Sequence, residues 1–368
     1  MRYNAVLDCN RFVSDPLVAS RVYRLSVRLI HVKFCNSFSA FNYRHPKSFN
    51  QAFGSSKSSK SQPMVPTKMA PTDLIDEILN ITDKLVNVRE LFIELWNFPL
   101  DDLQPLISSF WSSFGPKLYT LSLSGILGDI RTLINSNPIL GRLRDLRVEF
   151  SHSYIGTEAS RAILVDVLLP FINNLAPQLL SLKLFSWAPL DLSTFFSQLA
   201  PFPGLKALNV RTPSSGLDHL ICDSSDTLQR VYLRLNPSEL KLDPSSDKSF
   251  GWLLECISDG RFVSRLQVLD IYPLDMTAGM DFLLRCIQRT STNLVELIVR
   301  YRYLEDQEVM TIIDAASSCH NLTYLKMNIR RLDVGVTDSL ALKLPRINRL
   351  WLSIGERDSN YLTVCKTS

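Results

Sequence analysis

The chain has 368 residues, of which 46% are hydrophobic and 21% are charged, and its formal net charge is +4. This composition is typical of a globular protein with a large core, and it excludes collagen-like and highly charged disordered chains. No apolar run approaches the roughly 20 residues that cross a bilayer, so we expect no membrane-spanning segment.

The charge is unevenly distributed along the chain. Residues 1–70 hold eleven Lys or Arg against Asp8 and Asp15, whereas residues 71–368 hold 29 basic and 34 acidic residues. The body of the protein is therefore mildly acidic. Because nucleic-acid binding usually requires a basic domain, the sequence argues against a nucleic acid as the partner.

The cysteines indicate a reducing compartment. There are seven of them, an odd number, and they are widely scattered with no CxxC pair. This pattern favours reduced thiols over a disulfide framework or a zinc site. We therefore expect a cytoplasmic or nuclear protein.

The first predicted element lies within residues 1–34. Val22, Leu25 and Val27 follow the pattern apolar-x-x-apolar-x-apolar, so we interpret residues 1–34 as a detached first repeat-like segment. Residues 35–70 are rich in Ser and Lys and hold too little apolar surface to order themselves, which predicts a disordered insert. Two alternatives stay open: a cleaved mitochondrial presequence over residues 11–68, and an incorrectly assigned chain start.

The next predicted element is a helix over residues 71–79, Pro-Thr-Asp-Leu-Ile-Asp-Glu-Ile-Leu. Its apolar residues recur at helical spacing, and Thr72 or Asp73 would cap its N-terminus by accepting a hydrogen bond from a backbone amide. The following apolar triplet begins at Val88, so a strand comes almost directly after the helix.

The apolar triplet then returns along the rest of the chain. With the first one, the occurrences are Val22/Leu25/Val27, Val88/Leu91/Ile93, Leu118/Leu121/Leu123, Leu143/Leu146/Val148, Leu179/Leu182/Leu184, Leu205/Leu208/Val210, Leu228/Val231/Leu233, Leu266/Leu269/Ile271, Leu294/Leu297/Val299, Leu322/Leu325/Met327 and Ile347/Leu350/Leu352. A pattern this loose arises by chance on the order of ten times in a chain of this composition. The spacing carries the argument instead: after the first triplet, the starts lie 30, 25, 36, 26, 23, 38, 28, 28 and 25 residues apart, near the length of a leucine-rich repeat.

Segments with helical spacing lie between the triplets, for example residues 162–169, 280–287 and 309–316. One strand and one helix cannot bury their apolar faces alone, so each unit must stack on its neighbours. Parallel strands also need crossover connections, which these helices supply. The sequence therefore predicts an α/β fold, a leucine-rich-repeat solenoid over residues 71–355 with a parallel inner sheet and outer helices, followed by a tail at 356–368.

Three segments carry a resemblance to a known family. Residues 202–208 (FPGLKAL), 293–299 (NLVELIV) and 319–327 (CHNLTYLKM) resemble repeats of F-box and leucine-rich-repeat proteins, most of all the divergent fungal ones. The resemblance covers about residues 86–355, with one further unit near 12–30. The consensus asparagine eight positions after the first apolar residue is present only as Asn236, so we expect no ladder of asparagine side chains.

The resemblance implies a non-catalytic protein-recognition module, similar to the substrate-receptor part of an F-box ubiquitin-ligase subunit. Residues 71–79 resemble the opening helix of an F-box, which would contact a Skp1-type adaptor. A repeat helix is the competing interpretation, because the strand at Val88 leaves little room for the other F-box helices. The alternative function is a free-standing leucine-rich-repeat scaffold or inhibitor without a ubiquitin link.

The sequence offers no arrangement of catalytic residues. The five histidines are isolated from one another, and no pair of His or Cys has metal-ligand spacing. A Gly-rich phosphate loop and a nucleophile elbow are also missing from the sequence. We therefore expect no enzyme activity, no metal and no cofactor.

A binding surface is predicted on the strands instead. Side chains alternate between the two faces of a strand, so residues two, four and six positions after the first apolar residue should line the concave face. In the C-terminal half these are rich in Arg, Tyr and Trp, which often carry binding energy, and we predict that they bind an acidic or phosphorylated segment of a partner protein. The competing interpretation is a solvated sheet face with incidental charge. The predicted partner-binding residues are Arg211, Arg230, Tyr232, Arg234, Tyr272, Arg300, Tyr324, Lys326, Arg349 and Trp351.

Overall fold

Parallel strands in chain order form one open sheet. The computed structural model describes residues 19–30, 71–96, 103–136, 138–151, 157–187, 190–211, 214–234, 265–271 and 277–355. Within these residues the sheet has eleven strands, ordered from β1 to β11. They are β1 (Arg24–Ile30), β2 (Glu90–Trp96), β3 (Thr120–Ile126), β4 (Asp145–Ser151), β5 (Ser181–Ser186), β6 (Ala207–Arg211), β7 (Arg230–Arg234), β8 (Val268–Ile271), β9 (Glu296–Leu304), β10 (Tyr324–Ile329) and β11 (Arg349–Ile354).

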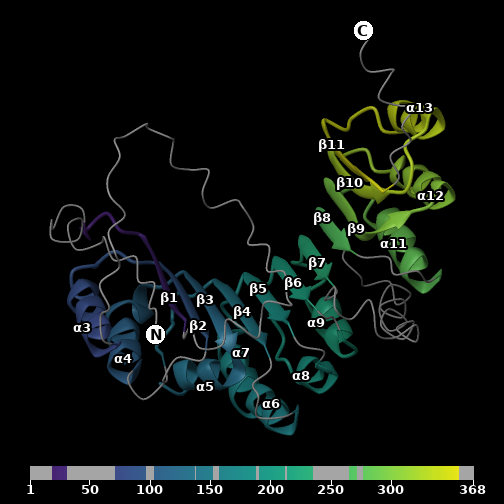
Figure 1. Cartoon of the computed structure of the whole chain (residues 1–368). Helices are drawn as coiled ribbons and strands as arrows, with labels where there is room; N and C mark the ends of the chain where they lie inside the picture. The colour runs from purple at the N-terminus through teal and green to yellow at the C-terminus, as the bar shows by residue number, and fades with distance from the viewer. Residues whose placement is uncertain are drawn as a thin grey trace, which may run out of the picture.

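The helices connect successive strands and lie on the outer side of the arc into which the sheet bends (Figure 1). Those described are α3 (Pro71–Thr82), α4 (Gln104–Ser113), α5 (Leu127–Asn135), α6 (Thr157–Ile163), α7 (Leu169–Leu175), α8 (Ser193–Ser197), α9 (Leu217–Asp223), α11 (Thr277–Arg289), α12 (Asp306–Ala316) and α13 (Val334–Lys343). Two short helical turns, η4 (Gly115–Lys117) and η5 (Leu164–Leu168), complete the set. The result is an α/β, repeat-like fold with helices on the convex side of a parallel sheet.

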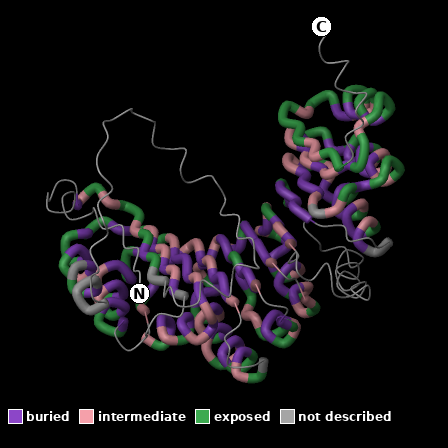
Figure 2. The backbone as a smooth tube through the Cα atoms, viewed as in Figure 1, coloured by how far each residue is buried: buried purple, intermediate pink, exposed green. Residues whose placement is uncertain are grey.

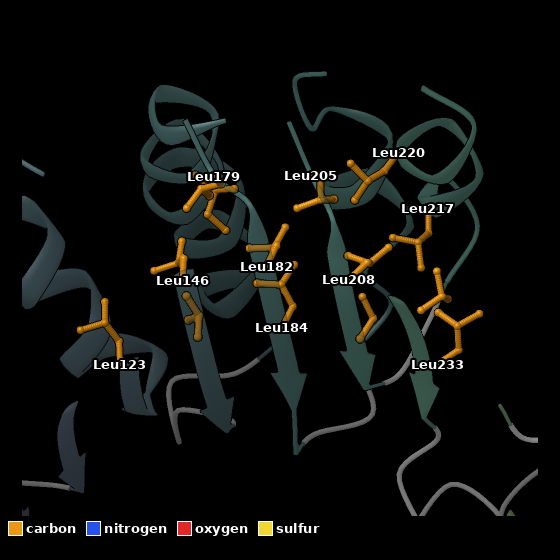
Figure 3. Close-up of a cluster of buried hydrophobic side chains, with 14 of the residues drawn as sticks. Leu123, Leu146, Leu179, Leu182, Leu184, Leu205, Leu208, Leu217, Leu220 and Leu233 are labelled. Atoms are coloured by element: carbon orange, nitrogen blue, oxygen red, sulfur yellow. The ribbon is translucent and has the colours of Figure 1, made fainter. Parts of the chain in front are cut away.

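The eleven predicted triplets coincide with the eleven strands, because each strand begins two residues after the first apolar residue of its triplet. The strands are paired so that the triplets align: Leu182 lies opposite Leu146 and Leu208, for example. Leu121, Leu208 and Leu297 are each 0% exposed. Figure 3 shows Leu146, Leu182 and Leu208 side by side on successive strands, with Leu217 and Leu220 of α9 beside Leu208, so one row of side chains builds a core that runs along the array.

Backbone hydrogen bonds repeat with the same period. The carbonyl one residue after the first apolar residue of each triplet accepts hydrogen bonds from two successive amides of the next unit. Tyr23 accepts from Arg89 and Glu90 in this way, and the same pair of bonds recurs at all ten described junctions, ending where Thr323 accepts from Asn348 and Arg349. Neighbouring units are thus joined laterally by main chain, independently of the residue type at each position.

The first repeat-like segment is part of the same sheet. β1 pairs with β2 over its full length, from Arg24 opposite Glu90 to Ile30 opposite Trp96. The partners are 66 residues apart in the chain, so the intervening residues do not disturb the register. Residues 1–18, 31–70 and 356–368 lie outside the described residues, so the insert at 35–70, the presequence and the tail stay predictions.

Helix α3 includes the predicted residues 71–79 and continues to Thr82. Ile75, Ile78 and Ile81 are buried in the same core as the strands. The apolar side chains that recur along one face of α3 therefore pack against the core of the repeat-like fold.

The two ends of the array differ in how well they are covered, as the distribution of burial in Figure 2 shows. Val27 in β1 is 8% exposed, whereas Leu350 and Ile354 in β11 are 47% and 40% exposed. The equivalent side chains of β10, Leu325 and Ile329, are fully buried because β11 covers them.

Candidate functional site

The concave face of the sheet is formed by the strand residues that point away from the helices. Strand pairing aligns them in three rows, of which the middle one runs from Arg147 in β4 through Lys183, Asn209, Tyr232, Asp270 and Ile298 to Lys326 and Trp351 in β11. We call this surface, from β4 to β11, the concave face. Within a row, side chains on adjacent strands lie about 4.8 Å apart, so their charges act on one another directly.

Two of the predicted binding arginines are already bound within the protein. Asp270 in β8 is fully buried, and its carboxylate accepts hydrogen bonds from Arg300 at 2.9 and 2.7 Å and from Arg234 at 3.0 Å. The two guanidinium groups are only about a quarter exposed. Arg234 and Arg300 therefore neutralise a buried acid, and much of their positive charge is compensated within the sheet.

A pair of cation–aromatic contacts orders the C-terminal end of the concave face. The Lys326 ammonium lies 4.6 Å from the centre of the Trp351 ring, and the Arg349 guanidinium lies 4.7 Å from that of Tyr324. Arg349 also donates a hydrogen bond of 2.8 Å to Glu296. Because Trp351 is 58% exposed, this end presents an aromatic ring together with a cation to solvent.

Arg230 and Tyr232 lie next to each other on the concave face in β7, where Arg230 is exposed and Tyr232 is partly buried. Burial raises the pKa of the Tyr232 hydroxyl, and Arg230 acts in the opposite direction. Tyr232 therefore stays protonated and can donate a hydrogen bond. Tyr272, the remaining predicted tyrosine of this region, lies outside the described residues.

The structure shows a second aromatic and cationic group, in β4–β6, of which the sequence analysis named only Arg211. Arg211 lies 3.9 Å from the centre of the Trp187 ring and 5.7 Å from that of Phe185, and Arg147 in β4 lies 4.9 Å from the ring centre of Phe185 in β5. Glu149 holds this group in place by accepting hydrogen bonds from Trp187 at 2.6 Å and from Arg147 at 2.5 Å.

Lys183 extends this second group toward β7. Burial lowers the pKa of the Lys183 ammonium, the attraction of Asp145 raises it, and the positive charges of Arg147, Arg230 and Arg234 lower it further. Positive charge is therefore concentrated between β4 and β7. The same spacing rule used for the C-terminal half would have found Arg147, Lys183 and Phe185; Trp187 lies after the strand, and no local sequence signal places it against Arg211.

The N-terminal end of the sheet is different. There Arg24 pairs with Glu90 and Arg28 pairs with Glu94, both at 2.5 Å. The strand β3 contributes Thr120, Ser122 and Ser124 at the corresponding positions. The pairs and the uncharged strand leave β1–β3 close to neutral, so the cationic part of the sheet begins at β4.

The described residues contain no group of three or more His, Cys, Asp or Glu arranged to hold a metal ion. Among the same residues, no helix combines the length and the apolar character that a membrane span requires. Burial raises the pKa of the Cys286 thiol well above its usual value and that of Cys319 to about 11. These two thiols are therefore protonated and poorly nucleophilic at neutral pH.

Comparison with known proteins does not assign the chain to a family. No protein-family model matches it. No curated protein is detectably similar to it in sequence. What the concave face does is therefore inferred from its own residues.

Proposed function

We propose that the protein is a leucine-rich-repeat solenoid that acts as a non-catalytic recognition module, and that its concave face binds an acidic or phosphorylated segment of another protein. One observation carries the proposal. Lys183, Arg211, Arg230 and Lys326 lie on this face and, among the described residues, have no carboxylate within ion-pair distance. Cations that are left over after the internal pairs have formed attract an external anion.

The aromatic side chains support the same proposal. Stacking on Trp187, Phe185 and Trp351 limits the motion of the cations, so less conformational entropy is lost when a partner binds. Tyr, Trp and Arg are also the residues that most often dominate interface energies. The strands that carry these groups belong to one sheet, which bends into an arc with its helices on the outer side (Figure 1).

A peptide array tests this function. Arrays of acidic, phosphorylated, neutral and basic peptides are incubated with the full chain and with the variant R230A/Y232A/K326A/W351A, which leaves the Asp270 ion pairs intact. We expect the full chain to bind acidic and phosphorylated peptides and the variant to lose this binding. A matched control, R131A/R161A/Y119A, removes two cations and an aromatic ring at exposed positions on helices α5 and α6 and before β3. Equal binding by all three proteins would refute the proposal.

The resemblance to F-box and leucine-rich-repeat proteins extends the proposal to the substrate receptor of a ubiquitin ligase. That role requires a Skp1-type adaptor to bind residues 71–79. The burial of Ile75 and Ile78 in the core favours the alternative, a free-standing scaffold or inhibitor in which α3 is a repeat helix. Copurification of the full chain with a Skp1-type adaptor separates the two. Stable binding that is lost on replacing the exposed Asp76 would support the receptor, and the lack of binding would leave the free-standing module.

A further inference from the structure

Buried polar side-chain atoms without a hydrogen-bond partner are concentrated at one place on the concave face. Such atoms are rare in folded proteins, and each one calls for an explanation. Among the described residues there are six: Nε of Arg147, Oδ1 of Asn209, Nε and Nη1 of Arg211, Nε of Arg234, and Oγ of Ser224. All except Ser224 lie on the concave face of β4, β6 and β7, and four of these five are N–H donors of arginines.

Strand pairing brings these residues together. Arg211 in β6 lies directly opposite Arg234 in β7 and Phe185 in β5. Asn209, which is 9% exposed, lies one step along the same face of β6, between Lys183 and Tyr232. Arg147 reaches the same place from β4, because its guanidinium and that of Arg211 both lie over the ring of Phe185.

Stacking on Trp187 explains how Arg211 can be held here without an acid. A guanidinium bound over an aromatic ring uses its flat face, and its N–H donors stay in the plane of the group. The ring at 3.9 Å therefore fixes the orientation of Arg211 without satisfying its donors. Such a guanidinium edge matches the geometry of a phosphate or carboxylate, which it can bind through two parallel hydrogen bonds.

The charges of the cluster identify the anion. Arg147 is paired with Glu149, and Arg234 is paired with Asp270. Arg211 and Lys183 remain, and among the described residues neither has a carboxylate within ion-pair distance. When Asp145, which attracts Lys183, and Arg300, which shares Asp270 with Arg234, are counted as well, the cluster holds two positive charges in excess. A phosphomonoester carries about −1.5 to −2 at neutral pH, whereas a carboxylate carries a single negative charge.

We propose that Arg211, with Lys183 and Arg147 around it, forms a binding site for a phosphoryl group, carried by a phosphorylated side chain of the partner segment. This inference rests on the proposed function and makes it more specific. The phosphate oxygens accept hydrogen bonds from the guanidinium of Arg211, whose side chain is partly exposed, and the exposed Lys183 ammonium contributes charge. The unpartnered Oδ1 of Asn209 is an acceptor, so it gives no hydrogen bond to the phosphate, and no covalent bond is made or broken.

The test uses short peptides in which the phosphate is the only side-chain charge. An acetylated and amidated Gly-Gly-phosphoserine-Gly-Gly peptide is titrated into the full chain, alongside versions with Ser and with Glu at the central position, and alongside inorganic phosphate. The readout is the nuclear magnetic resonance signal of the Arg211 Nε–H, assigned by its loss in R211K. We expect the phosphopeptide to shift this signal, and the Ser peptide to leave it unchanged.

Affinity measurements on variants complete the test. R211K keeps the positive charge but loses the planar pair of donors, and we expect it to weaken phosphopeptide binding about tenfold or more, the loss of one charge-assisted hydrogen bond. R161K makes the same exchange at an exposed arginine of α6 and should change nothing. Thermal melts of both variants show whether they fold, and Lys183→Ala, which removes the second unpaired cation, provides a further variant with the same expected direction of change.

The outcomes separate this site from the proposed function. If inorganic phosphate shifts the Arg211 signal as the phosphopeptide does, the phosphoryl site is supported, and the phosphoryl group alone is sufficient for binding there. If the Glu peptide binds as tightly as the phosphopeptide, or if no probe moves the Arg211 signal at millimolar concentration, the phosphoryl site is refuted. In that case, array binding that depends on Lys326 and Trp351 would still uphold the proposed function, and the lack of array binding would refute both.

Discussion

Asp270 and Arg300 form a two-pronged ion pair across adjacent strands, with both carboxylate oxygens of Asp270 accepting hydrogen bonds from one guanidinium group. The acid is fully buried and also accepts a hydrogen bond from Arg234 on its other side. This network joins β7, β8 and β9 through side chains. The described residues end at residue 234 in β7 and resume at residue 265, just before β8. The stability of the sheet at this junction should depend on it.

Replacing Asp270 should therefore lower the free energy of unfolding. In Asp270→Ala two partly buried arginines lose their partner, and we expect the free energy of unfolding to fall by about 3 kcal/mol, because unpaired charges remain in the sheet. Chemical denaturation followed by circular dichroism measures the change. Glu296→Ala is the control: its partner Arg349 is 61% exposed, and the expected loss is below about 1 kcal/mol. Similar losses for both variants would show that the Asp270 network does not hold these strands together.

The core row can be tested at Leu208, which is fully buried between Leu182 and Val231. Leu208→Ala should lower the unfolding free energy by about 2–5 kcal/mol, since the lost contacts leave a cavity. Leu342→Ala, at a residue of α13 that is 80% exposed, should change it by less than about 0.5 kcal/mol. Equal effects at the two positions would contradict the assignment of Leu208 to the core.

Gly125 in β3 permits a close approach of two backbones. A Cβ atom at this position would lie 2.3 Å from the Leu95 carbonyl oxygen of β2, so Gly125→Ala must displace main chain. We expect a loss of about 1–3 kcal/mol in unfolding free energy, as for other overpacked sites. Gly141→Ala is the matched control, because a Cβ there meets no atom within 4 Å. A Gly125→Ala protein as stable as the Gly141→Ala protein would refute the close approach.

Cys319 should give the stability a measurable pH dependence. Its thiol is buried, which raises its pKa from 9.0 to about 11, so the folded protein favours the protonated form. The resulting stabilisation is fully present below pH 9 and is lost as the pH rises through 11, by about 2–3 kcal/mol in total. Denaturation of wild type and Cys319→Ala between pH 9 and 11 should show a shallower decline in the variant. Parallel declines would contradict this assignment, since other groups, such as Cys286, titrate equally in both proteins.

The positions of the strands could be predicted from the sequence because they depend on local spacing. Each triplet places two apolar side chains on one face of a strand, and near-regular spacing brings successive strands into register. Even the strand that follows Val22 pairs with the strand that follows Val88, although the two lie 66 positions apart in the chain. The repeated hydrogen bonds to main-chain carbonyls, as at Tyr23 and Thr323, could not be predicted, because hydrogen bonds between main-chain groups do not depend on residue type.

The candidate site was predictable only in outline. The alternation of side chains identified Arg211, Arg230 and Lys326 as residues of the concave face. Which arginines stay free depends on contacts between strands. Asp270 binds Arg234 and Arg300, which lie 36 and 30 positions away in the chain. The stacking of Arg211 on Trp187 likewise depends on how the chain leaves β5, which spacing rules do not describe.

The most direct test of the central claim is arginine footprinting of the concave face. The full chain is treated with phenylglyoxal with and without an acidic or phosphorylated peptide selected from the array, and the modified residues are identified by mass spectrometry. We predict that the peptide protects Arg230, which is exposed on the concave face, and leaves Arg131 and Arg161 on the outer helices as reactive as before. Protection of Arg131 and Arg161 with Arg230 unchanged would place the partner on the convex side and contradict the account.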